Sequence, residues 1–437
     1  LFYVTGTSFS APHVTGAAAL LLQAFPSLTA KEVVQILLDT TTDLGAVGSD
    51  AIFGSGLLNL AEAFSPQGPL SVPTNNAAGP ELFPYDLLAS NSTLNMGPAF
   101  GDSGLGMGPI GLLSRTLVFD KYDRTYIADL SHNISARQGG SFSLAGAARH
   151  SVYRRNHEIE LLEIGFIEFG YTEEWGSISK AQLFPNRLLG DSKHIFATSL
   201  RLTSALSRAT DIIVAHGFSA GGIMSKAVLG PSKPLSFKST GSAGSAFLGL
   251  SRGGTNIGLS HRLSPQTEVT VVFGTSELDL GDGERSLSRR ATAAQVTRRI
   301  GEAYRVGIQF GILEEDGSVL ETVGRGAFDA VNSATTRFIA LTAAAEFNNW
   351  TFVIQGSQGT TAISEREGML LHSFDSLRTS AYRAAAYWRA PLPGHVLGFS
   401  VAQPLRVESG GALVKVPTGR DLTTEAFSFT SQAVNFS

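Results

Sequence analysis

Side chains in residues 304–312 of this 437-residue chain alternate strictly between apolar positions and polar or glycine positions. A two-residue period places neighbouring side chains on opposite faces, so the segment is predicted to be a β-strand with two unlike faces. The same alternation returns at 381–389 and at 396–401. The apolar face of the first segment consists of Tyr304, Val306, Ile308, Phe310 and Ile312. These repeats predict an antiparallel, β-rich domain.

Turn signals separate the predicted strands. Gly, Asn, Asp, Glu or Pro cluster at 281–283, 314–317, 347–349 and 391–394, where we expect hairpin turns. A further strand is predicted within 158–171, and residues 116–130 mix apolar with charged side chains. Glycine is frequent, at 48 residues, and the 27 Phe outnumber the 9 Tyr and 3 Trp together. This usage favours hairpin-rich β structure.

Strands of about 9–11 residues that are apolar on one face only are typical of outer-membrane β-barrels. Aromatic residues near strand ends, such as Tyr382 and Trp388, would suit the membrane interfaces. A soluble antiparallel β domain is the alternative, because it also has one face in water and one in a core. The alternation alone leaves both open.

Composition excludes some classes of protein. The chain has no cysteine, so disulfides and thiolate metal sites are excluded, and this usage fits an exported bacterial protein. A net charge of −4 without a basic stripe argues against nucleic acid as a partner. No run reaches the roughly 18 apolar residues of a membrane-spanning helix. No convincing cluster of metal ligands is found, so no cofactor is identified.

A second feature lies at the other end of the chain, where residues 6–14 read Gly-Thr-Ser-Phe-Ser-Ala-Pro-His-Val. The small and apolar run 14–22 that follows predicts a buried helix ending near residues 24–26. Ser8 would then lie at the helix N-terminus, where free N–H groups and the helix dipole favour developing negative charge. Gly6 lets the backbone approach a bound peptide, and Pro12 is expected near the first helical turn.

Two more features follow in order. Residues 26–38 predict an amphipathic helix, in which Thr29 and Glu32 form a capping-box pattern. Residues 53–63 read Gly-x-Gly-x-Leu-Asn from position 54 to 59 and then predict a short helix. Together the three features resemble the serine motif and closing segments of the subtilisin-like serine peptidases, the S8 class. The resemblance covers residues 1–64.

The resemblance implies a role for each residue of the motif. Ser8 would be the nucleophile, and its backbone N–H would donate to the oxyanion. Gly6, Thr7 and Pro12 would support the turn that carries it. Ser10 is expected to be a small buried helix residue, and His13 a packed structural histidine.

In the subtilisin order, the catalytic Asp and His precede the Ser. Both partners, together with the side-chain oxyanion donor, are therefore expected upstream of residue 1. We expect the chain to be a fragment that is truncated within the peptidase domain and has no peptidase activity by itself. Because it stops at Phe436-Ser437, the closing strands of a barrel are also expected to be missing.

The predicted fold class is multidomain. Residues 1–64 would be the C-terminal part of an α/β subtilisin-like domain, 65–115 a Pro-, Gly-, Asn- and Ser-rich linker, and 116–437 a large antiparallel β-barrel-like domain. This order resembles the subtilisin-like autotransporter peptidases of Gram-negative bacteria. That resemblance implies an exported protein, secreted or held at the outer membrane, with peptide or protein substrates and contact with membrane lipid. Calcium is bound by many members of the family, at sites that cannot be located in this piece.

Two alternative functions remain. The β domain could be the main functional part, an outer-membrane anchor or translocation barrel with a degenerate peptidase remnant. Residues 217–221 read Gly-Phe-Ser-Ala-Gly after an apolar run, the nucleophile-elbow pattern of α/β-hydrolases, which makes Ser219 a candidate esterase nucleophile. The elbow requires alternating β and α units, whereas the segments around Ser219 read as strands. Residues 106–111 match a dinucleotide fingerprint only in spelling, because Pro109 spoils the helix start.

Overall fold

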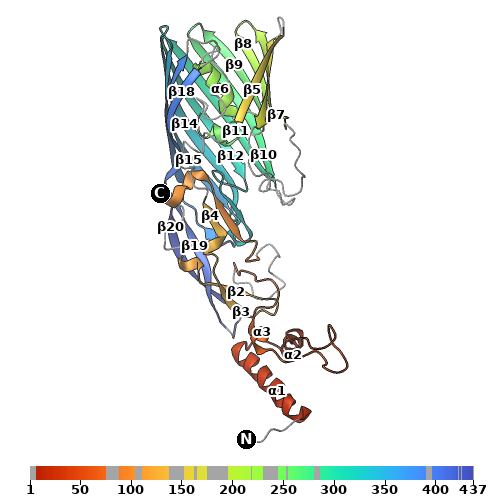
Figure 1. Cartoon of the computed structure of the whole chain (residues 1–437). Coiled ribbons are helices and arrows are strands. Elements are labelled where there is room, and N and C mark those ends of the chain that lie inside the picture. Colours follow the sequence, from red (N-terminus) through yellow and green to blue (C-terminus); the bar gives the residue numbers. More distant parts are fainter. Residues whose placement is uncertain are drawn as a thin grey trace.

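The computed structural model describes residues 6–74, 88–103, 111–136, 152–161, 165–174, 195–217, 219–229, 245–251, 254–279, 286–389, 396–421, 423–424 and 426–436. A small helical segment lies at one end of an elongated molecule, and a large β domain forms the rest (Figure 1). None of the described helices is both long and apolar enough to cross a bilayer.

The helical segment consists of α1 (Thr7–Ala24), α2 (Ala30–Asp39) and α3 (Leu60–Phe64). The predicted capping box at the start of α2 is present: Thr29 Oγ1 accepts a bond from Glu32 N, and the Glu32 carboxylate accepts one from Thr29 N. Asn59 caps α3 by accepting a bond from Glu62 N. The second and third helices expected from the sequence are therefore confirmed.

The prediction of a buried first helix is wrong for most of its surface. Only Ala17 and Leu21 of α1 are buried, whereas Val14, Leu20 and Leu22 are 42–47% exposed. The reason is that α2 and α3 contact only one side of α1. The helix also begins earlier than expected, at Thr7, so Pro12 lies inside it rather than in its first turn.

The β domain is built on a twelve-stranded antiparallel sheet, which curls into a barrel-like wall (Figure 1). Each strand pairs with the next one of the sheet along the chain. In order, the strands are β5 (Val152–Leu161), β6 (Gly165–Glu174), β7 (Ile195–Ser207), β8 (Thr210–His216), β9 (Thr255–Ser264), β10 (Thr267–Asp279), β11 (Ser286–Ile300), β12 (Tyr304–Asp316), β14 (Val331–Phe347), β15 (Trp350–Glu365), β17 (Leu377–Arg389) and β18 (Val396–Ser409).

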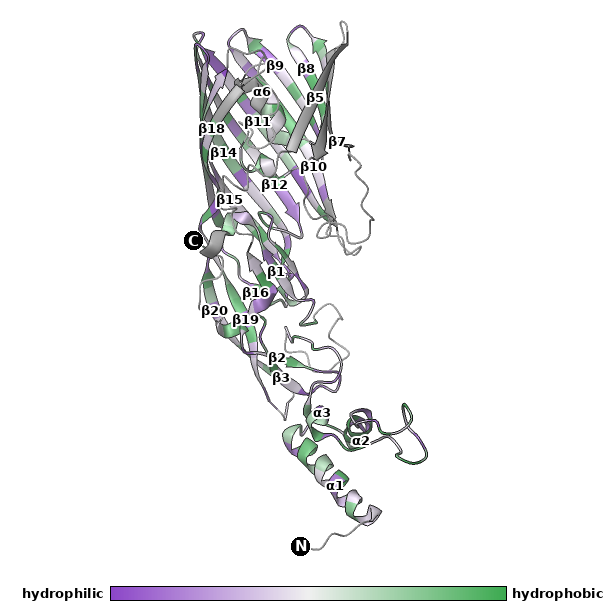
Figure 2. Ribbon diagram, in the orientation of Figure 1, coloured by the Kyte–Doolittle hydropathy of each residue, from purple (hydrophilic) through white to green (hydrophobic). Residues whose placement is uncertain are grey.

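The two faces of this wall are inverted relative to those of a soluble protein. Along β12 the apolar Ile308, Phe310 and Ile312 are exposed, whereas Gln309 and Glu315 are buried. Figure 2 shows the same mixture of apolar and polar residues along the neighbouring strands. Buried polar residues on the inner face include Asn256, Ser260, Thr270, Gln295, Thr297, Gln309, Thr336 and Thr342. The predicted alternation is thus confirmed, with its apolar face pointing outward.

The predicted turns have mixed outcomes. The turn at 347–349 is confirmed, because β14 ends at Phe347 and β15 begins at Trp350. The turn at 314–317 is wrong: Glu314 and Asp316 still pair with β14, and the chain turns only afterwards. The strand predicted within 158–171 is a hairpin of β5 and β6. The turns at 281–283 and 391–394 lie outside the described residues.

The wall has two unlike ends. At one, which we call the short-turn end, connections of two or three residues at 208–209, 265–266, 301–303 and 348–349 join successive strands. At the other, the loop end, the connections between β8 and β9, β12 and β14, and β15 and β17 are much longer. The loop end faces the helical segment (Figure 1).

Small sheets cover the loop end. They comprise β13 (Val323–Arg325), β1 (Thr93–Met96) and β4 (Ile134–Ala136); β16 (Leu371–His372), β19 (Gly411–Arg420) and β20 (Phe427–Asn435); and β2 (Thr116–Phe119) with β3 (Thr125–Ala128). The 3₁₀ helices η3 (Pro98–Ser103), η4 (Ser131–Asn133) and η8 (Gly326–Phe328) lie among them. Residues 65–115, predicted as a linker, thus contain β1 and η3.

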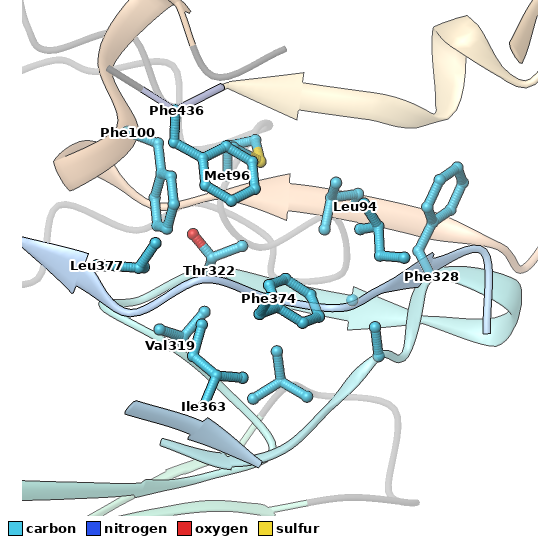
Figure 3. A pocket seen from close by; sticks show the side chains of 14 residues that line it. Leu94, Met96, Phe100, Val319, Thr322, Phe328, Ile363, Phe374, Leu377 and Phe436 are labelled. Atoms are coloured by element: carbon cyan, nitrogen blue, oxygen red, sulfur yellow. The ribbon is translucent and has the colours of Figure 1, made fainter. Parts of the chain in front are cut away.

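An apolar pocket separates these sheets (Figure 3). Phe100 and Phe436 meet edge to face at 5.3 Å between ring centroids, beside Met96 and Leu377. Leu94, Met96 and Phe100 are at most 4% exposed, so the segment around β1 is part of the core. The predicted boundaries of the peptidase-like part, the linker and the β domain stay a prediction.

Glycine on the inner face should be hard to replace. A Cβ at Gly311 would lie 2.3 Å from Phe338 Cζ, whereas one at Gly356 would lie 3.7 Å from Tyr382 Cδ1. We expect Gly311→Ala to lower the free energy of unfolding by roughly 1–3 kcal/mol, the usual cost of overpacking. Gly356→Ala is the matched control and should change it little. Equilibrium unfolding in urea measures both, and equal effects would contradict this account of the inner face.

Candidate active-site segment and its junction with the β domain

Ser8 is the second residue of α1 and is exposed. The backbone N–H groups of a first helical turn have no intrahelical acceptor, and they carry the positive end of the helix dipole. The first turn holds no acidic side chain that would compete for them. This position suits a nucleophile whose own N–H donates to an oxyanion, and the catalytic role itself stays a prediction.

Gly6 is the N-cap residue of α1 and Thr7 is its first residue. Pro12 has no N–H, so the Ser8 carbonyl lacks the donor that an unbroken helix would place four residues later. The three residues predicted to support Ser8 therefore lie at the start of the same helix: Gly6 and Thr7 precede Ser8, and Pro12 follows it by one turn. Their functional importance is untested.

The expectations for Ser10 and His13 are wrong as far as burial is concerned. Both are exposed, because the first half of α1 extends beyond α2 and α3. His13 Nδ1 lies 2.7 Å from the Phe9 carbonyl oxygen, one turn back on the same helix. It therefore bonds to its own backbone and is not packed in a core.

Within the described part of the chain, no side chain bonds to the Ser8 hydroxyl. No group of three or more metal-ligating side chains is found among those residues either. Among the described residues, Ser8 therefore lies in the first turn of α1 and bonds to no base.

Ser219 lies far from this segment, between β8 and the helix α6 (Ala220–Leu229). A strand, a turn at Gly217 with φ of 77°, and a helix do follow one another here, as an elbow requires. However, β8 pairs antiparallel with both β7 and β9, whereas the α/β-hydrolase elbow lies in a mainly parallel sheet. No described side chain bonds to the Ser219 hydroxyl.

Arg124, which forms a buried ion pair within the β2–β3 hairpin, joins this hairpin to the helical segment. Arg124 Nη2 lies 2.7 Å from Asp120 Oδ2, and neither side chain is exposed. Arg124 also donates to the carbonyl oxygens of Ala63 and Ser65, at 2.6 and 3.0 Å, at the C-terminal end of α3. One guanidinium thus satisfies a carboxylate on the hairpin and two carbonyls of the helical segment.

Aromatic rings surround this guanidinium. It lies 5.1 Å from the ring centroid of Phe25 and 5.6 Å from that of Tyr126. The Tyr126 hydroxyl donates to the Phe64 carbonyl oxygen at 3.1 Å. Burial raises the pKa of Tyr126 to about 12, so the hydroxyl keeps its proton at neutral pH. The guanidinium at the centre of this contact is buried and hydrogen-bonded.

The same turn contacts the other side of the β domain. Asp123, with φ of 61°, accepts bonds from Arg420 at the end of β19 through its carboxylate and its carbonyl oxygen. Arg420 also lies 5.3 Å from the ring of Phe427 on β20. Residues 120–124, which we call the junction turn, therefore link α3 to β19. From the sequence, this region was described only as a mixture of apolar and charged residues. The Asp-Lys-Tyr-Asp-Arg run at 120–124, between two apolar strands, is the sequence feature that could have indicated the turn.

Comparison with known proteins agrees with the sequence resemblance. Residues 2–56 match the Subtilase family of S8 peptidases. The chain is 48% identical over 61 residues to an extracellular serine protease of Serratia marcescens. It is 51% identical over 70 residues to the Neisserial autotransporter lipoprotein NalP of Neisseria meningitidis. These stretches cover 14% and 16% of this chain and 6% of each relative.

Two solved structures have a low structural similarity to parts of this chain. The in-vitro folded OmpT of Vibrio cholerae gives a TM-score of 0.31 at 6% identity, over 66% of this chain and 87% of that one. A FadL homologue of Pseudomonas aeruginosa gives 0.29 at 8% identity, over 64% and 75%. These are loose likenesses, and the antiparallel wall is established by the strand pairing of this chain itself.

The N-terminal part of the chain is therefore similar to the subtilisin-like serine peptidases over residues 2–56. A large antiparallel β domain follows it.

The junction turn should depend on Arg124 more than on its neighbours. Replacing one member of a buried ion pair leaves the other charge without a counter-charge, which costs about 3–5 kcal/mol. We expect Arg124→Ala to lower the free energy of local opening at residues 60–65 and 116–128 by that amount. Lys121→Ala is the control, since its pair with Asp39 is half-exposed and 3.8 Å long, and such pairs contribute about 0–1 kcal/mol. Amide hydrogen exchange measures both, and equal protection in the two variants would contradict the proposed importance of Arg124.

Proposed function

We propose that this chain belongs to an exported serine endopeptidase of a Gram-negative bacterium, with Ser8 as the nucleophile. The observation that carries the proposal is an exposed serine at the N-terminus of a helix within the segment that matches the Subtilase family. Gly6 and Thr7 begin the turn that presents it, and Pro12 leaves its carbonyl outside the helical bonding pattern.

The reaction would proceed through an acyl-enzyme. Ser8 Oγ attacks the carbonyl carbon of the scissile peptide bond while a histidine takes the hydroxyl proton. The Ser8 N–H, at the positive end of α1, donates to the oxyanion that forms. The histidine returns the proton to the leaving amine, and water then hydrolyses the acyl-enzyme.

The histidine and the aspartate that orients it are supplied by residues other than those described here. His13 cannot serve, because it lies on the same exposed helix and bonds to the Phe9 carbonyl. We therefore propose that the 437-residue chain alone does not hydrolyse peptides. Substrates are peptides or proteins, and calcium, if the whole protein binds it, is held by residues outside this segment.

The β domain is proposed to be an outer-membrane barrel that holds or exports the peptidase. Its wall exposes apolar side chains and buries polar ones, as a lipid-facing wall requires. Aromatic side chains also gather on the outer face at the short-turn end, where ring centroids within β15 or on neighbouring strands lie 5.6–6.4 Å apart. Such belts suit the interface between lipid and water. These residues are Tyr304, Phe347, Trp350, Phe352 and Trp388.

A second candidate function is an anchor or translocation barrel that carries a degenerate peptidase remnant. The size of the wall relative to the helical segment favours it. The two candidates differ in whether Ser8 reacts in the whole protein. An esterase that uses Ser219 is disfavoured by the antiparallel surroundings of that residue.

Active-site labelling distinguishes these functions. A fluorophosphonate probe should label the whole protein, and Ser8→Ala should abolish the label because it removes the nucleophilic oxygen. Ser10→Ala, two residues away on the same exposed helix turn, is the matched control and should still label. Labelling that survives Ser8→Ala but is lost with Ser219→Ala would instead support the esterase. The 437-residue chain by itself should not label.

The membrane assignment predicts a cost for charge on the outer face. Ile339 lies in the middle of β14 and is 41% exposed, whereas Ile127 on β3 is 66% exposed outside the wall. We expect Ile339→Arg to lower the free energy of unfolding in lipid vesicles by about 2–4 kcal/mol. Ile127→Arg, the same change at an exposed position, should alter it by less than about 0.5 kcal/mol. Urea titration with heat-modifiable gel migration measures both. A soluble β domain would tolerate the two changes equally and would not partition into vesicles.

A further inference from the structure

Two exposed arginines share one row on the outer face of the wall. Arg337 on β14 pairs with Thr360 on β15, and Thr360 pairs with Arg378 on β17. All three residues are exposed, whereas the residue that follows each of them in the chain is buried. Side chains directly opposite each other on antiparallel strands point to the same face, so these three leave the wall together. We call Arg337, Thr360 and Arg378 the arginine row.

The arginine row carries positive charge without a counter-charge. Within the part of the chain that the structure describes, no ion pair or hydrogen bond is found for the guanidinium of Arg337 or Arg378. Arg290, on β11, differs from them. Its guanidinium lies 3.9 Å from Glu314 Oε2 and 3.7 Å from Asp316 Oδ2 on β12. The outer face is thus balanced at β11 and β12 and positive at β14 and β17.

A third arginine lies beside the row. Arg406 on β18 is exposed and pairs with Ser380, two residues after Arg378. Glu408, two residues further along β18, accepts hydrogen bonds from Ser380 Oγ at 2.6 Å and from Gln403 Nε2 at 3.3 Å. Neutral donors therefore bind this carboxylate, and among the described residues it forms no ion pair with Arg406. The patch keeps a net positive charge.

The spacing of the arginine row suits a phosphate group. Neighbouring strands lie about 4.8 Å apart, so the backbones of Arg337 and Arg378 are about 10 Å apart, with Thr360 halfway between them. Two arginine side chains can reach across that distance from both sides. Guanidinium groups bind phosphate oxygens through paired N–H donors, and the exposed Thr360 hydroxyl can add another donor at the centre.

The row also lies where the edge of a lipid-facing band is expected. Phe347, in the aromatic group at the short-turn end, and Arg337 are ten positions apart on β14. Ten residues of an antiparallel strand are about 34 Å long. At the roughly 35–45° tilt of outer-membrane strands, this length spans about 24–28 Å of height, close to the roughly 25 Å of an apolar band. The aromatic group and the arginine row would thus lie at opposite interfaces.

Apolar side chains lie between these two levels. On β14 and β15, Ile339, Leu341, Phe352 and Ile354 are 41–61% exposed. The acyl chains of a lipid whose headgroup is bound at the arginine row would lie along these side chains. A free phosphate ion would make no use of them. The combination of charge and apolar surface therefore favours a lipid over a small anion.

We propose that the arginine row binds the phosphate of an anionic lipid, whose acyl chains lie on the outer face of β14 and β15. Arg337 and Arg378 bind the phosphate oxygens from both sides, and Thr360 Oγ1 donates a hydrogen bond between them. Arg406 adds to the attraction, as basic residues near a headgroup do. This inference rests on the proposal that the wall is a membrane barrel, and it names the lipid class and the site.

Lipid binding to the 437-residue chain in detergent micelles tests the site. Native mass spectrometry measures the retention of phosphatidylglycerol, which is anionic, and of phosphatidylcholine, which has no net charge. The chain should retain one phosphatidylglycerol more tightly than phosphatidylcholine. Arg337→Gln with Arg378→Gln should weaken that binding about thirtyfold, because each arginine near an anionic headgroup supplies roughly a factor of five.

Arg290→Gln with Arg298→Gln is the matched control. It removes the same total charge from exposed positions of β11, leaves the arginine row intact and should change the affinity little. Thr360→Val keeps every charge and should weaken binding several-fold, because it removes the central donor. Equal weakening in the two double variants, or an unchanged affinity in Thr360→Val, would overturn the site. Complete displacement of the lipid by inorganic phosphate would show that a free anion is the occupant instead.

The outcomes separate this inference from the membrane assignment. Heat-modifiable migration and recovery in vesicles report on the barrel, and neither requires the arginine row. If the chain stays out of vesicles, the membrane assignment is wrong. If it inserts into phosphatidylcholine vesicles but retains both lipids equally in micelles, the arginine row does not select anionic lipid, while the barrel stands.

Discussion

The period-two alternation of the wall is the constraint on which the rest of the β domain depends. In the described part of the chain, ten strands of the wall pair on both sides and β5 and β18 pair on one, and the alternation sends apolar side chains to one face and polar ones to the other. Because the polar face is the buried one, it needs hydrogen-bond partners inside the molecule. The segment between β8 and β9 supplies several of them, through the backbone carbonyls of α6 and of residue 250.

The helical segment obeys the opposite rule, and its attachment reflects this. Its apolar residues lie inward where α2 and α3 meet α1, and its link to the β domain is polar: Arg124, Asp120 and the last carbonyls of α3. A buried ion pair contributes little net stability compared with an apolar contact, but it tolerates only one arrangement of its partners. The junction turn therefore defines how the helical segment is oriented on β19, through Asp123 and Arg420, more than how tightly it is held.

Features written in local sequence could be predicted. The alternation of 304–312 and the capping pair Thr29 and Glu32 need only neighbours along the chain. Features that depend on distant partners could not. The burial predicted for α1 failed because the apolar sequence of a helix does not tell how many of its faces other elements contact. In this structure only Ala17 and Leu21 of α1 are buried. The turn expected at 314–317 failed because Glu315 is held in the strand by Arg289 and by the N–H of Leu320.

The even number of described strands in the wall determines where the chain enters and leaves it. Successive antiparallel strands reverse direction, so an even number places the start of β5 and the end of β18 at the same end of the wall. That is the loop end, where β1, β19 and the junction turn also lie. Chain that enters and leaves the wall at one end has no need to pass through its interior in the folded state. Helix α6 lies against the inner face of the wall, and the helical segment lies outside the wall.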